Sequence, residues 1–519
     1  MEVNMSIYTQ REHNGLYELT DVARAELIDS KYYNWDLAPT SLAQRTWTTY
    51  NVASLWVGMC ICLPSYVLAA SLVSLGLSTW AAVLNVALGS LILLVPMQLN
   101  SHVGTKYGVP YPVFARLSFG PRGAHIASMA RAVAGCGWVG IQTWYGGNAL
   151  HLILMAMIPD YNGNLATLTV VCLLFWGANL AMAYRGPGWL RKLEAFGAPF
   201  LGCLTVALFI WATVMTSQKG VGMMDILNQP MDYEKLNSHS VGGMAAVFAA
   251  GITSNLAFWS MLALNIPDFS RYAKSQKVQF RGQLIGLPTT MVLFALIGAY
   301  VTAATGHLTP DGSLLKDPAE VISMIGNPFA IVLGCAGIAI ATLTTNIAAN
   351  ILAPANGFSN LCPKKISYKT GVIITCILAL ALIPILKPAE FMKNEYVYIY
   401  DWMGSFGIAL APMAGIFIAD YYFVKKKNVD VMSLFEGEDG RYWYRSGFNI
   451  RAFITWAAAC IPPFLVRLPF LSHMLFFHVL SNNGYIVSFL IALALYPILM
   501  KSNTTSLVLD DEMESMTER

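Results

Sequence analysis

The sequence predicts an all-α integral membrane protein with about twelve transmembrane helices. Hydrophobic residues make up 56% of the 519-residue chain, charged residues make up only 12%, and the mean hydropathy is +0.53. One soluble core could not enclose so much apolar side chain, so lipid must cover much of it. The third observation is the recurrence of apolar runs of about 20 residues, the length that crosses the hydrocarbon of a bilayer.

Twelve apolar runs follow one another between short polar connections. They are 49–72, 79–99, 126–156, 165–183, 195–216, 242–265, 284–305, 328–352, 370–386, 397–419, 450–468 and 484–500. Because positive charge resists translocation, loops rich in Lys and Arg stay in the cytoplasm, and the even-numbered connections hold nineteen such residues against six in the odd ones. We therefore predict a plasma (inner) membrane protein with both termini in the cytoplasm.

The two ends of the chain are polar and lie outside the apolar runs. Residues 1–46 have no basic stretch followed by an apolar one, so we expect no cleaved signal peptide and assign them to a cytoplasmic N-terminal segment. Residues 501–519 are rich in acidic side chains and are expected to form a solvated cytoplasmic tail.

Composition and motifs argue against several classes of function. The net charge is only +3 and no basic patch is evident, so nucleic acid is not an expected partner. The nine cysteines lack the spacing of zinc or iron-sulfur sites. No HExxH helix, GxSxG elbow or phosphate-binding glycine loop is found, so we expect neither an enzyme nor a resident cofactor.

Helix breakers occur in the first and sixth apolar runs. Gly58 and Pro64 lie in the first run, and Gly251 and Pro267 lie in or just after the sixth. Both helices are therefore candidates for an interruption near mid-depth, which suits a transporter built from two repeats of five helices. The alternative is that these are ordinary prolines and glycines of membrane helices.

The eighth apolar run carries an unusual polar face. Ala341, Thr344 and Thr345 are three and four residues apart, so one helix face offers two hydroxyls beside a backbone carbonyl. Such hard oxygen ligands suit a small cation. Asn346 and Asn350 form a neighbouring stripe of amides that could pair with a ring presenting N–H and C=O groups. The alternative is that all four polar side chains bond to other helices.

A second polar pair lies on the third run. Trp138 and Gln142 are four residues apart, so an indole and an amide share one helix face and suit a flat polar ring. Trp259 in the sixth run could supply a second stacking face. The alternative for Trp138 is packing or anchoring at the membrane interface.

Carboxylates such as Asp268 lie near the ends of the predicted helices and not at mid-span. A proton relay of carboxylates and histidines across the membrane is therefore less expected than transport coupled to an ion that neutral oxygens bind.

Several sequence blocks follow one another along about 390 residues. They are Asn34-Trp35-Asp36-Leu37-Ala38-Pro39-Thr40, Gln44-Arg45-Thr46-Trp47, Leu55-Trp56-Val57-Gly58-Met59, Lys106-Tyr107-Gly108-Val109, Ser118-Phe119-Gly120-Pro121-Arg122-Gly123, Gly137-Trp138-Val139-Gly140-Ile141-Gln142-Thr143-Trp144, Asn346-Ile347-Ala348-Ala349-Asn350 and Gly415-Ile416-Phe417-Ile418-Ala419-Asp420-Tyr421-Tyr422. In this order they resemble the nucleobase:cation symporter family, and most closely its allantoin, hydantoin and uracil carriers.

The resemblance implies a leucine-transporter-type fold with a 5+5 inverted repeat plus two C-terminal helices. Residues 47–420 would form the ten-helix core, with repeats at about 47–217 and 241–420, and residues 421–500 would hold a loop and helices 11 and 12. The resemblance also implies that Trp138 and Trp259 sandwich a ring while Gln142 and Asn350 bond its edge. For a sodium ion, the matching ligands are the carbonyls of Gly58, Ile61 and Ala341 and the hydroxyls of Thr344 and Thr345.

Two positions depart from the hydantoin carrier of that family. Cys62 stands at a substrate-site position where the carrier has a glutamine, so an amide contact from the first helix is lost. Phe258 replaces a glycine beside the stacking tryptophan and narrows the site.

The expected function is a symporter that imports a small planar cyclic amide, such as allantoin, a hydantoin or uracil, together with a cation, for which sodium is the first candidate. A proton-coupled purine or pyrimidine permease is the alternative, followed by an uncoupled channel or receptor. We expect a monomer in the lipid bilayer.

Overall fold

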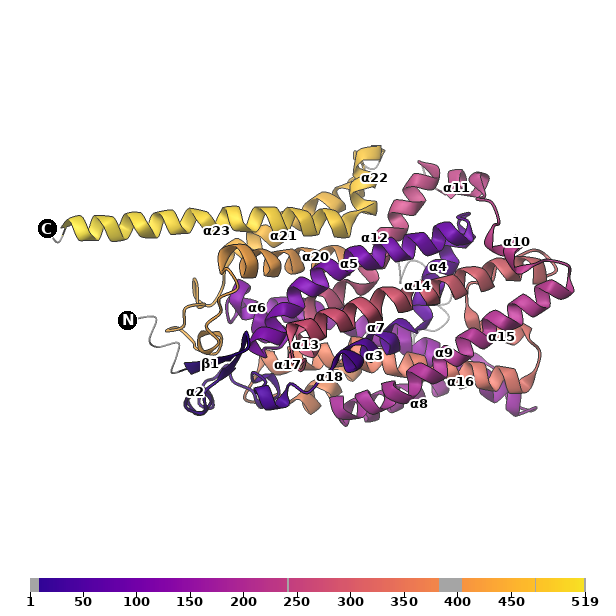
Figure 1. The fold of residues 1–519 in the computed structure, drawn as a ribbon, viewed down its shortest axis with the longest axis horizontal. Helices are drawn as coiled ribbons and strands as arrows, with labels where there is room; N and C mark the ends of the chain where they lie inside the picture. Colours follow the sequence, from indigo (N-terminus) through magenta and orange to yellow (C-terminus); the bar gives the residue numbers. More distant parts are fainter. Residues whose placement is uncertain (1–8, 240–241, 382–403, 472, 518–519) are drawn as a thin grey trace.

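Long helices dominate the computed structural model, which describes residues 9–239, 242–381, 404–471 and 473–517 (Figure 1). The first described strand, β1 (Gln10–His13), and the end of the last helix, α23 (Gly484–Thr517), lie toward the same end of the helix bundle (Figure 1). The short N-terminal elements are β1 (Gln10–His13), β2 (Leu16–Leu19), α2 (Asp21–Leu27), η1 (Trp35–Leu37) and η2 (Leu42–Gln44).

The helices of the first half begin with a pair separated by two residues. They are α3 (Thr49–Cys60), α4 (Leu63–Ser74), α5 (Thr79–Tyr107), α6 (Tyr111–Phe119), α7 (Gly123–Met157), α8 (Leu165–Tyr184), α9 (Pro187–Gln218), α10 (Met223–Leu227) and α11 (Tyr233–His239).

The second half contains two π-helical segments among its α-helices. The elements are α12 (Gly243–Asn265), α13 (Pro267–Ser270), α14 (Gln276–Leu308), α15 (Pro318–Met324), α16 (Pro328–Thr345), the π-helix η3 (Asn346–Ile351), α17 (Leu352–Leu361), α18 (Tyr368–Ala381), α20 (Gly404–Ile418), the π-helix η6 (Ala419–Val424), η7 (Met432–Leu434), α21 (Ile450–Phe464), η8 (Leu465–Arg467), α22 (Leu475–Asn482) and α23 (Gly484–Thr517).

The predicted apolar runs coincide with helices wherever the structure describes them. Among the described residues, nine helices are long and apolar enough to cross a membrane, and the bent pair α3–α4 gives a tenth. Helix α7 has 35 residues but is too polar to pass the same test, and the run at 370–386 and the start of that at 397–419 extend outside the described residues. The total of twelve spans therefore stays a prediction.

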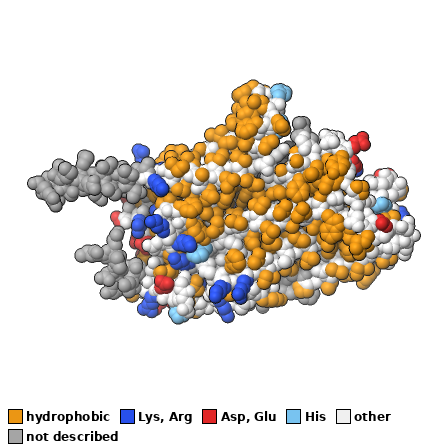
Figure 2. Space-filling model, turned by 45° about the horizontal axis from the view of Figure 1, so that its top comes forward, with side chains coloured by type: hydrophobic (Ala, Val, Ile, Leu, Met, Phe, Trp, Pro, Cys, Tyr) orange, Lys and Arg blue, Asp and Glu red, His pale blue; other side chains and the backbone are white. Residues whose placement is uncertain are grey.

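The surface has the pattern of a membrane protein. Figure 2 shows hydrophobic side chains covering the flank of the bundle, while Lys and Arg side chains gather at the end where the N-terminal segment packs. Leu84, Leu91, Val95 and Leu293 are among the exposed apolar residues of this flank's helices. Lipid can cover such side chains at no hydrophobic cost.

The expected break in the first helix is present. Helices α3 and α4 meet at 57°, with Ile61 and Cys62 between them. The Cys62 N–H donates to the Cys60 carbonyl at 2.9 Å instead of to the Gly58 carbonyl, which would be its partner in a continuous helix. The bend thus releases the Gly58 carbonyl oxygen from the helical hydrogen-bond ladder.

The expected interruption of the sixth helix near mid-depth is wrong. Helix α12 runs unbroken from Gly243 to Asn265 and gives way to α13 only at Ile266. Gly251 serves packing instead, because a Cβ atom there would lie 2.7 Å from the Asn85 amide oxygen and 2.8 Å from a Leu72 methyl group. The glycine lets α12 approach α5 and α4 closely.

The helices divide into two groups that pack mainly within themselves. In the first group, α14 packs against α3, α4 and α5, and α12 packs against α5. In the second group, α7 packs against α8, α16, α17 and α18. Each half of the chain gives two consecutive spans to the first group and the next two to the second, although the inverted repeat itself stays a prediction.

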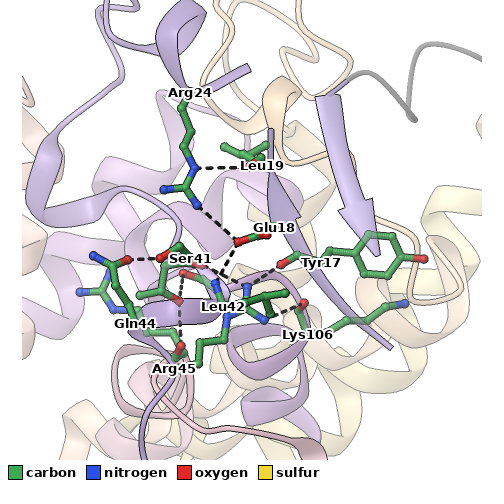
Figure 3. A network of polar contacts seen from close by, with 12 residues as sticks. Tyr17, Glu18, Leu19, Arg24, Ser41, Leu42, Gln44, Arg45 and Lys106 are labelled. Carbon is green, nitrogen blue, oxygen red and sulfur yellow. Dashed lines mark hydrogen bonds and ion pairs between the residues drawn. The ribbon is translucent and has the colours of Figure 1, made fainter. Parts of the chain in front are cut away.

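Arg45 fastens the N-terminal segment to the bundle (Figure 3). Its guanidinium donates to the carbonyls of Thr105 at 2.8 Å, Thr40 at 3.1 Å and Tyr17. Burial lowers the pKa of Arg45 to about 10, so the side chain keeps its charge at neutral pH. Glu18 completes the network by accepting from the Leu42 N–H at 3.0 Å.

We predict that Arg45→Ala destabilises the fold, because three buried carbonyl groups would lose a charged donor. The loss should be roughly 3 kcal/mol in the free energy of unfolding. Thermal unfolding of the detergent-solubilised protein, followed by tryptophan fluorescence, measures it. Arg11→Ala, which removes an exposed arginine from the same segment, is the matched control. Equal midpoints for the two variants would contradict this role of Arg45.

Candidate functional site

Four predicted site residues surround one cavity between the two helix groups. Trp138 and Gln142 come from α7 and Asn350 from η3, all in the second group, whereas Trp259 comes from α12 in the first group. The cavity is also lined by Phe258, Met261, Leu262, Thr345 and Ala349. The structure therefore brings these four residues together, and their role in binding stays a prediction.

The cavity is small in this structure. Its volume of about 20 Å³ corresponds to roughly one water molecule, which is less than a five- or six-membered ring needs. The Phe258 ring centroid lies 5.4 Å from that of Trp138 and 4.7 Å from that of Trp259, so one phenyl ring contacts both indoles. In this conformation Phe258 takes up space beside the two indoles that a planar ligand would need.

Two polar atoms of the cavity wall have no hydrogen-bond partner among the described residues. They are Gln142 Oε1, an acceptor, and Trp259 Nε1, a donor, and both side chains are at most 2% exposed. A buried polar atom without a partner costs about 1–3 kcal/mol. A ligand that offers a donor to Gln142 and an acceptor to Trp259 would recover that energy.

Asn350 and Asn346 have different surroundings, although both lie in η3. Asn350 lines the cavity and donates to Asn346 Oδ1 at 3.1 Å. Asn346 donates to the Val139 carbonyl at 3.2 Å and to Asn179 Oδ1 at 3.1 Å, so it links α7 and α8 to its own helix. The sequence left open whether these amides face a ligand or bond to other helices. In the structure Asn346 bonds to other helices, and Asn350 faces the cavity.

Arg131, which the sequence analysis did not single out, forms hydrogen bonds to residues next to the site. It is fully buried on α7 and donates through Nη2 to the Ala349 carbonyl at 2.6 Å and through Nε to Asn265 Oδ1 at 3.0 Å. The π-helical turn displaces backbone carbonyls from the ordinary α-helical ladder. Arg131 satisfies one of them directly beside Asn350 and thereby holds the orientation of that turn.

Close approach of α7 to η3 and α17 depends on Gly135. A Cβ atom at this position would lie 2.5 Å from Pro354 Cγ and 3.0 Å from the Asn350 carbonyl oxygen. Any larger residue would push η3 away from α7, and Asn350 would then lie farther from Gln142.

Cys62 does not line this cavity with the other four predicted substrate residues, and its role in substrate binding stays a prediction. It caps α4, and its Sγ lies 3.2 Å from Ser65 Oγ. The bend between α3 and α4 turns the thiol toward a separate apolar cavity of about 280 Å³, which is also lined by Ile61, Tyr66 and Ala341.

The predicted cation ligands lie where α3 meets α16. The Thr345 hydroxyl is 3.4 Å from the Gly58 carbonyl oxygen, and the Thr344 hydroxyl donates to the Ala341 carbonyl at 2.9 Å. Ile61 packs in one cluster with Ala341 and Leu201. These five predicted ligands thus come from both helix groups. The Gly58 carbonyl oxygen among them is the oxygen that the bend between α3 and α4 releases from its helical hydrogen bond.

The chemistry of this second location is that of neutral oxygen donors. In the part of the chain that the structure describes, no group of three or more His, Cys, Asp and Glu side chains could hold a metal ion. Carbonyl and hydroxyl oxygens are hard ligands, which suit a small cation such as sodium better than a transition metal. Whether the five residues bind an ion stays a prediction.

Comparison with known proteins assigns the fold and the family. The family model described as "Permease for cytosine/purines, uracil, thiamine, allantoin" matches residues 39–492. The chain belongs to the nucleobase:cation symporter family. This permease is 38% identical to the purine-uracil permease of Arabidopsis thaliana over 487 residues, 91% of this chain and 78% of that protein.

Two further relatives agree with this assignment. The permease is 34% identical to the allantoin permease of Bacillus subtilis (strain 168) over 478 residues, which cover 90% of this chain and 93% of that one. Its fold matches the nucleobase-cation-symport-1 transporter Mhp1 in a closed conformation with bromovinylhydantoin bound, with a TM-score of 0.75, 22% identity and coverage of 92% and 96%. The predicted leucine-transporter-type fold is confirmed.

We predict that Phe258→Ala enlarges the site and admits bulkier rings. The affinity for 5-benzylhydantoin relative to hydantoin should rise about tenfold, equivalent to about 1.4 kcal/mol, because filling a hydrophobic space is worth about that much. Equilibrium binding of the two compounds to the purified permease measures the ratio. Phe248→Ala, in the same helix but away from the cavity, is the control. An unchanged ratio in Phe258→Ala would show that Phe258 does not limit the size of the ligand.

Proposed function

We propose that this permease is a secondary active symporter that imports a small planar cyclic amide together with sodium. The observation that carries the proposal is the cavity between the two helix groups. There Gln142 Oε1 and Trp259 Nε1 are buried beside Trp138 and Asn350, and neither atom has a hydrogen-bond partner in the described part of the chain. A cyclic amide or imide offers ring N–H and C=O groups to these atoms and a flat face to the indoles.

The names of the relatives support the substrate class. Among them are permeases for purines and uracil, for allantoin and for hydantoin, the last from Microbacterium maritypicum with 25% identity. Allantoin, hydantoins and uracil all contain a ring in which N–H and C=O groups alternate. The proposed substrate is therefore one of these compounds or a related nucleobase.

The oxygen cluster of Gly58, Ile61, Ala341, Thr344 and Thr345 supports sodium as the coupling ion. Sodium at this cluster would hold α3 of the first group against α16 of the second, and Thr345 also lines the substrate cavity. An ion that raises substrate affinity ten- to a hundredfold supplies about 1.4 to 3 kcal/mol of coupling free energy. The alternative is a proton-coupled nucleobase permease in which this cluster binds no ion.

The proposed mechanism is alternating access, in which the two helix groups rock about the sites between them. Ion and substrate would bind from one side, and a rotation of the groups would then open the cavity to the other side. The Lys and Arg side chains at the N-terminal end of the bundle support a cytoplasmic location of that end in the plasma membrane (Figure 2). We expect the transporting unit to be a monomer.

Proteoliposomes test the function directly. Labelled allantoin, hydantoin, uracil and cytosine are offered with sodium and proton gradients imposed separately. We expect one of these compounds to accumulate above its external concentration when sodium is higher outside. Accumulation driven by a proton gradient alone would favour the proton-coupled alternative, and equilibration without accumulation would indicate a channel.

We predict that Gln142→Ala and Asn350→Ala each weaken uptake, because each removes one hydrogen bond to a buried ring edge. Such a loss costs about 1 to 3 kcal/mol, which corresponds to a rise in KM of roughly five- to a hundredfold. Initial rates at matched surface expression measure this change. Gln218→Ala, which removes an exposed glutamine, is the control. Normal uptake by both cavity variants would exclude this site.

We predict that Thr345→Ala raises the sodium concentration needed for half-maximal uptake by about tenfold or more, since one of five oxygen ligands is lost. Sodium titration of uptake into proteoliposomes measures it. Thr342→Ala is the matched control, because the Thr342 hydroxyl donates to the Ile338 carbonyl of its own helix at 2.6 Å. The same sodium dependence of uptake in both variants would contradict a sodium site at Thr345.

A further inference from the structure

A larger cavity lies at the N-terminal end of the bundle, beyond the candidate site. Its volume is about 580 Å³, and its wall includes Leu55 of α3, Asp268 of α13 and Asn356 of α17. These residues lie on or next to the chain segments that carry Gly58, Trp259 and Asn350. The larger cavity is thus bordered by continuations of the elements that form the central site.

The cavity is also walled by residues that the proposed function leaves without a role. Asp36, Pro39, Thr40, Gln44 and Trp47 belong to the first two blocks that resemble the family, and all five line it. The Trp47 N–H donates to the Tyr272 carbonyl at 2.9 Å, so the N-terminal segment is bonded to the loop that follows α13. The Arg45 network holds this wall in place (Figure 3).

Arg271 lines this cavity and has buried donors without a hydrogen-bond partner among the described residues. The side chain is 6% exposed, and Nη2 donates to the Asp36 carbonyl at 3.2 Å and to the Tyr272 hydroxyl at 2.7 Å. Its Nε and Nη1 groups have no partner among the described residues, and the guanidinium forms no ion pair with any of them. The guanidinium also lies over the Tyr272 ring, with Cζ 4.9 Å from the ring centroid, which offsets part of the cost of burying its charge. The two unbonded donors remain costly to bury.

Asp268 supplies the complementary group three residues earlier. Its carboxylate is 2% exposed and accepts from the Tyr111 N–H at 2.9 Å and from Asn265 Nδ2 at 3.4 Å. Within the described residues it has no ion pair, although Arg271 lines the same cavity. The two opposite charges therefore share a space without contacting each other.

We propose that this cavity is a second binding site for the same class of planar cyclic amide, with Arg271 bonded to a ring C=O and Asp268 to a ring N–H. An amide edge carries an acceptor and a donor side by side, so one neutral molecule can serve both charges at once. Trp47 and Tyr272, whose ring centroids are 5.6 Å apart, add aromatic surface to the wall of the cavity. This proposal rests on the proposed function. It adds a second substrate-binding site between the central cavity and the N-terminal end of the helix bundle.

Transport kinetics measured from the two faces test this second site. Labelled uracil and allantoin are offered to right-side-out and inside-out vesicles that contain Arg271→Gln or Asp268→Asn. Each substitution should raise the KM at the face that carries the N-terminal segment about tenfold and change the KM at the other face less than twofold. A substitution that only damages the fold would lower transport from both faces alike, and Arg271→Lys should restore part of the affinity.

Arg24→Gln is the matched control. Arg24 lines the same cavity, but its Nε donates to the Leu19 carbonyl at 3.2 Å and its Nη2 lies 3.9 Å from Glu18, so it has partners already. We expect its KM values at both faces to match those of the unmodified permease.

Equilibrium binding to the unmodified permease in detergent gives an independent readout. Labelled uracil or allantoin should bind at two molecules per chain. The Asn350→Ala variant should bind one molecule per chain, because it loses the central site and keeps the second one. A single molecule per chain, or equal KM changes at both faces, would overturn the second site. Failure of the unmodified permease to bind or carry any compound of the panel would instead refute the proposed function.

Discussion

The structure depends on one constraint, which is that a polar group inside a bilayer must find its partner within the protein. The bend between α3 and α4 withdraws the Gly58 carbonyl from its helix, and the hydroxyl of Thr345, 3.4 Å away on α16, is the nearest replacement. The π-helical turn at Asn346–Ile351 releases carbonyls in the same way, and Arg131 bonds one of them. Irregular backbone is thus confined to places where another helix can compensate for it.

Several polar contacts of these residues cross from one helix group to the other. Gly58 and Thr345, and likewise Arg131 and Asn265, belong to different groups, and the central cavity lies between the same groups. Because the helices pack mainly within each group, a rotation of one group against the other disturbs little of the helix packing. The polar contacts that would change in such a rotation are the ones beside the two candidate sites.

Much of this architecture could be predicted from local sequence. The apolar runs located the helices, and the spacing of Trp138 and Gln142 placed an indole and an amide on one helix face, because α-helical geometry is regular. The break at Ile61 and Cys62 followed from Gly58 and Pro64. By contrast, Gly251 was misjudged as a helix breaker, since a glycine that admits a neighbouring helix has the same local sequence as one that ends a helix.

Other features depend on contacts between distant segments and had no local signal. The π-helical turn requires Arg131 from another helix, and neither residue pattern indicates it alone. The direction of the Cys62 thiol follows from the angle between α3 and α4, which the sequence does not specify. The folded N-terminal segment was expected only as a polar stretch, because its order comes from Arg45 and from carbonyls sixty residues away.

The small volume of the central cavity has a consequence for the passage of water and ions through the protein. A gap that holds roughly one water molecule cannot contain the unbroken file of waters along which protons or hydrated ions would pass. In this conformation the central cavity therefore supplies no continuous water path for protons or hydrated ions. Packing of Phe258 against two indoles thus limits the water that the cavity can hold as well as its space for a ligand.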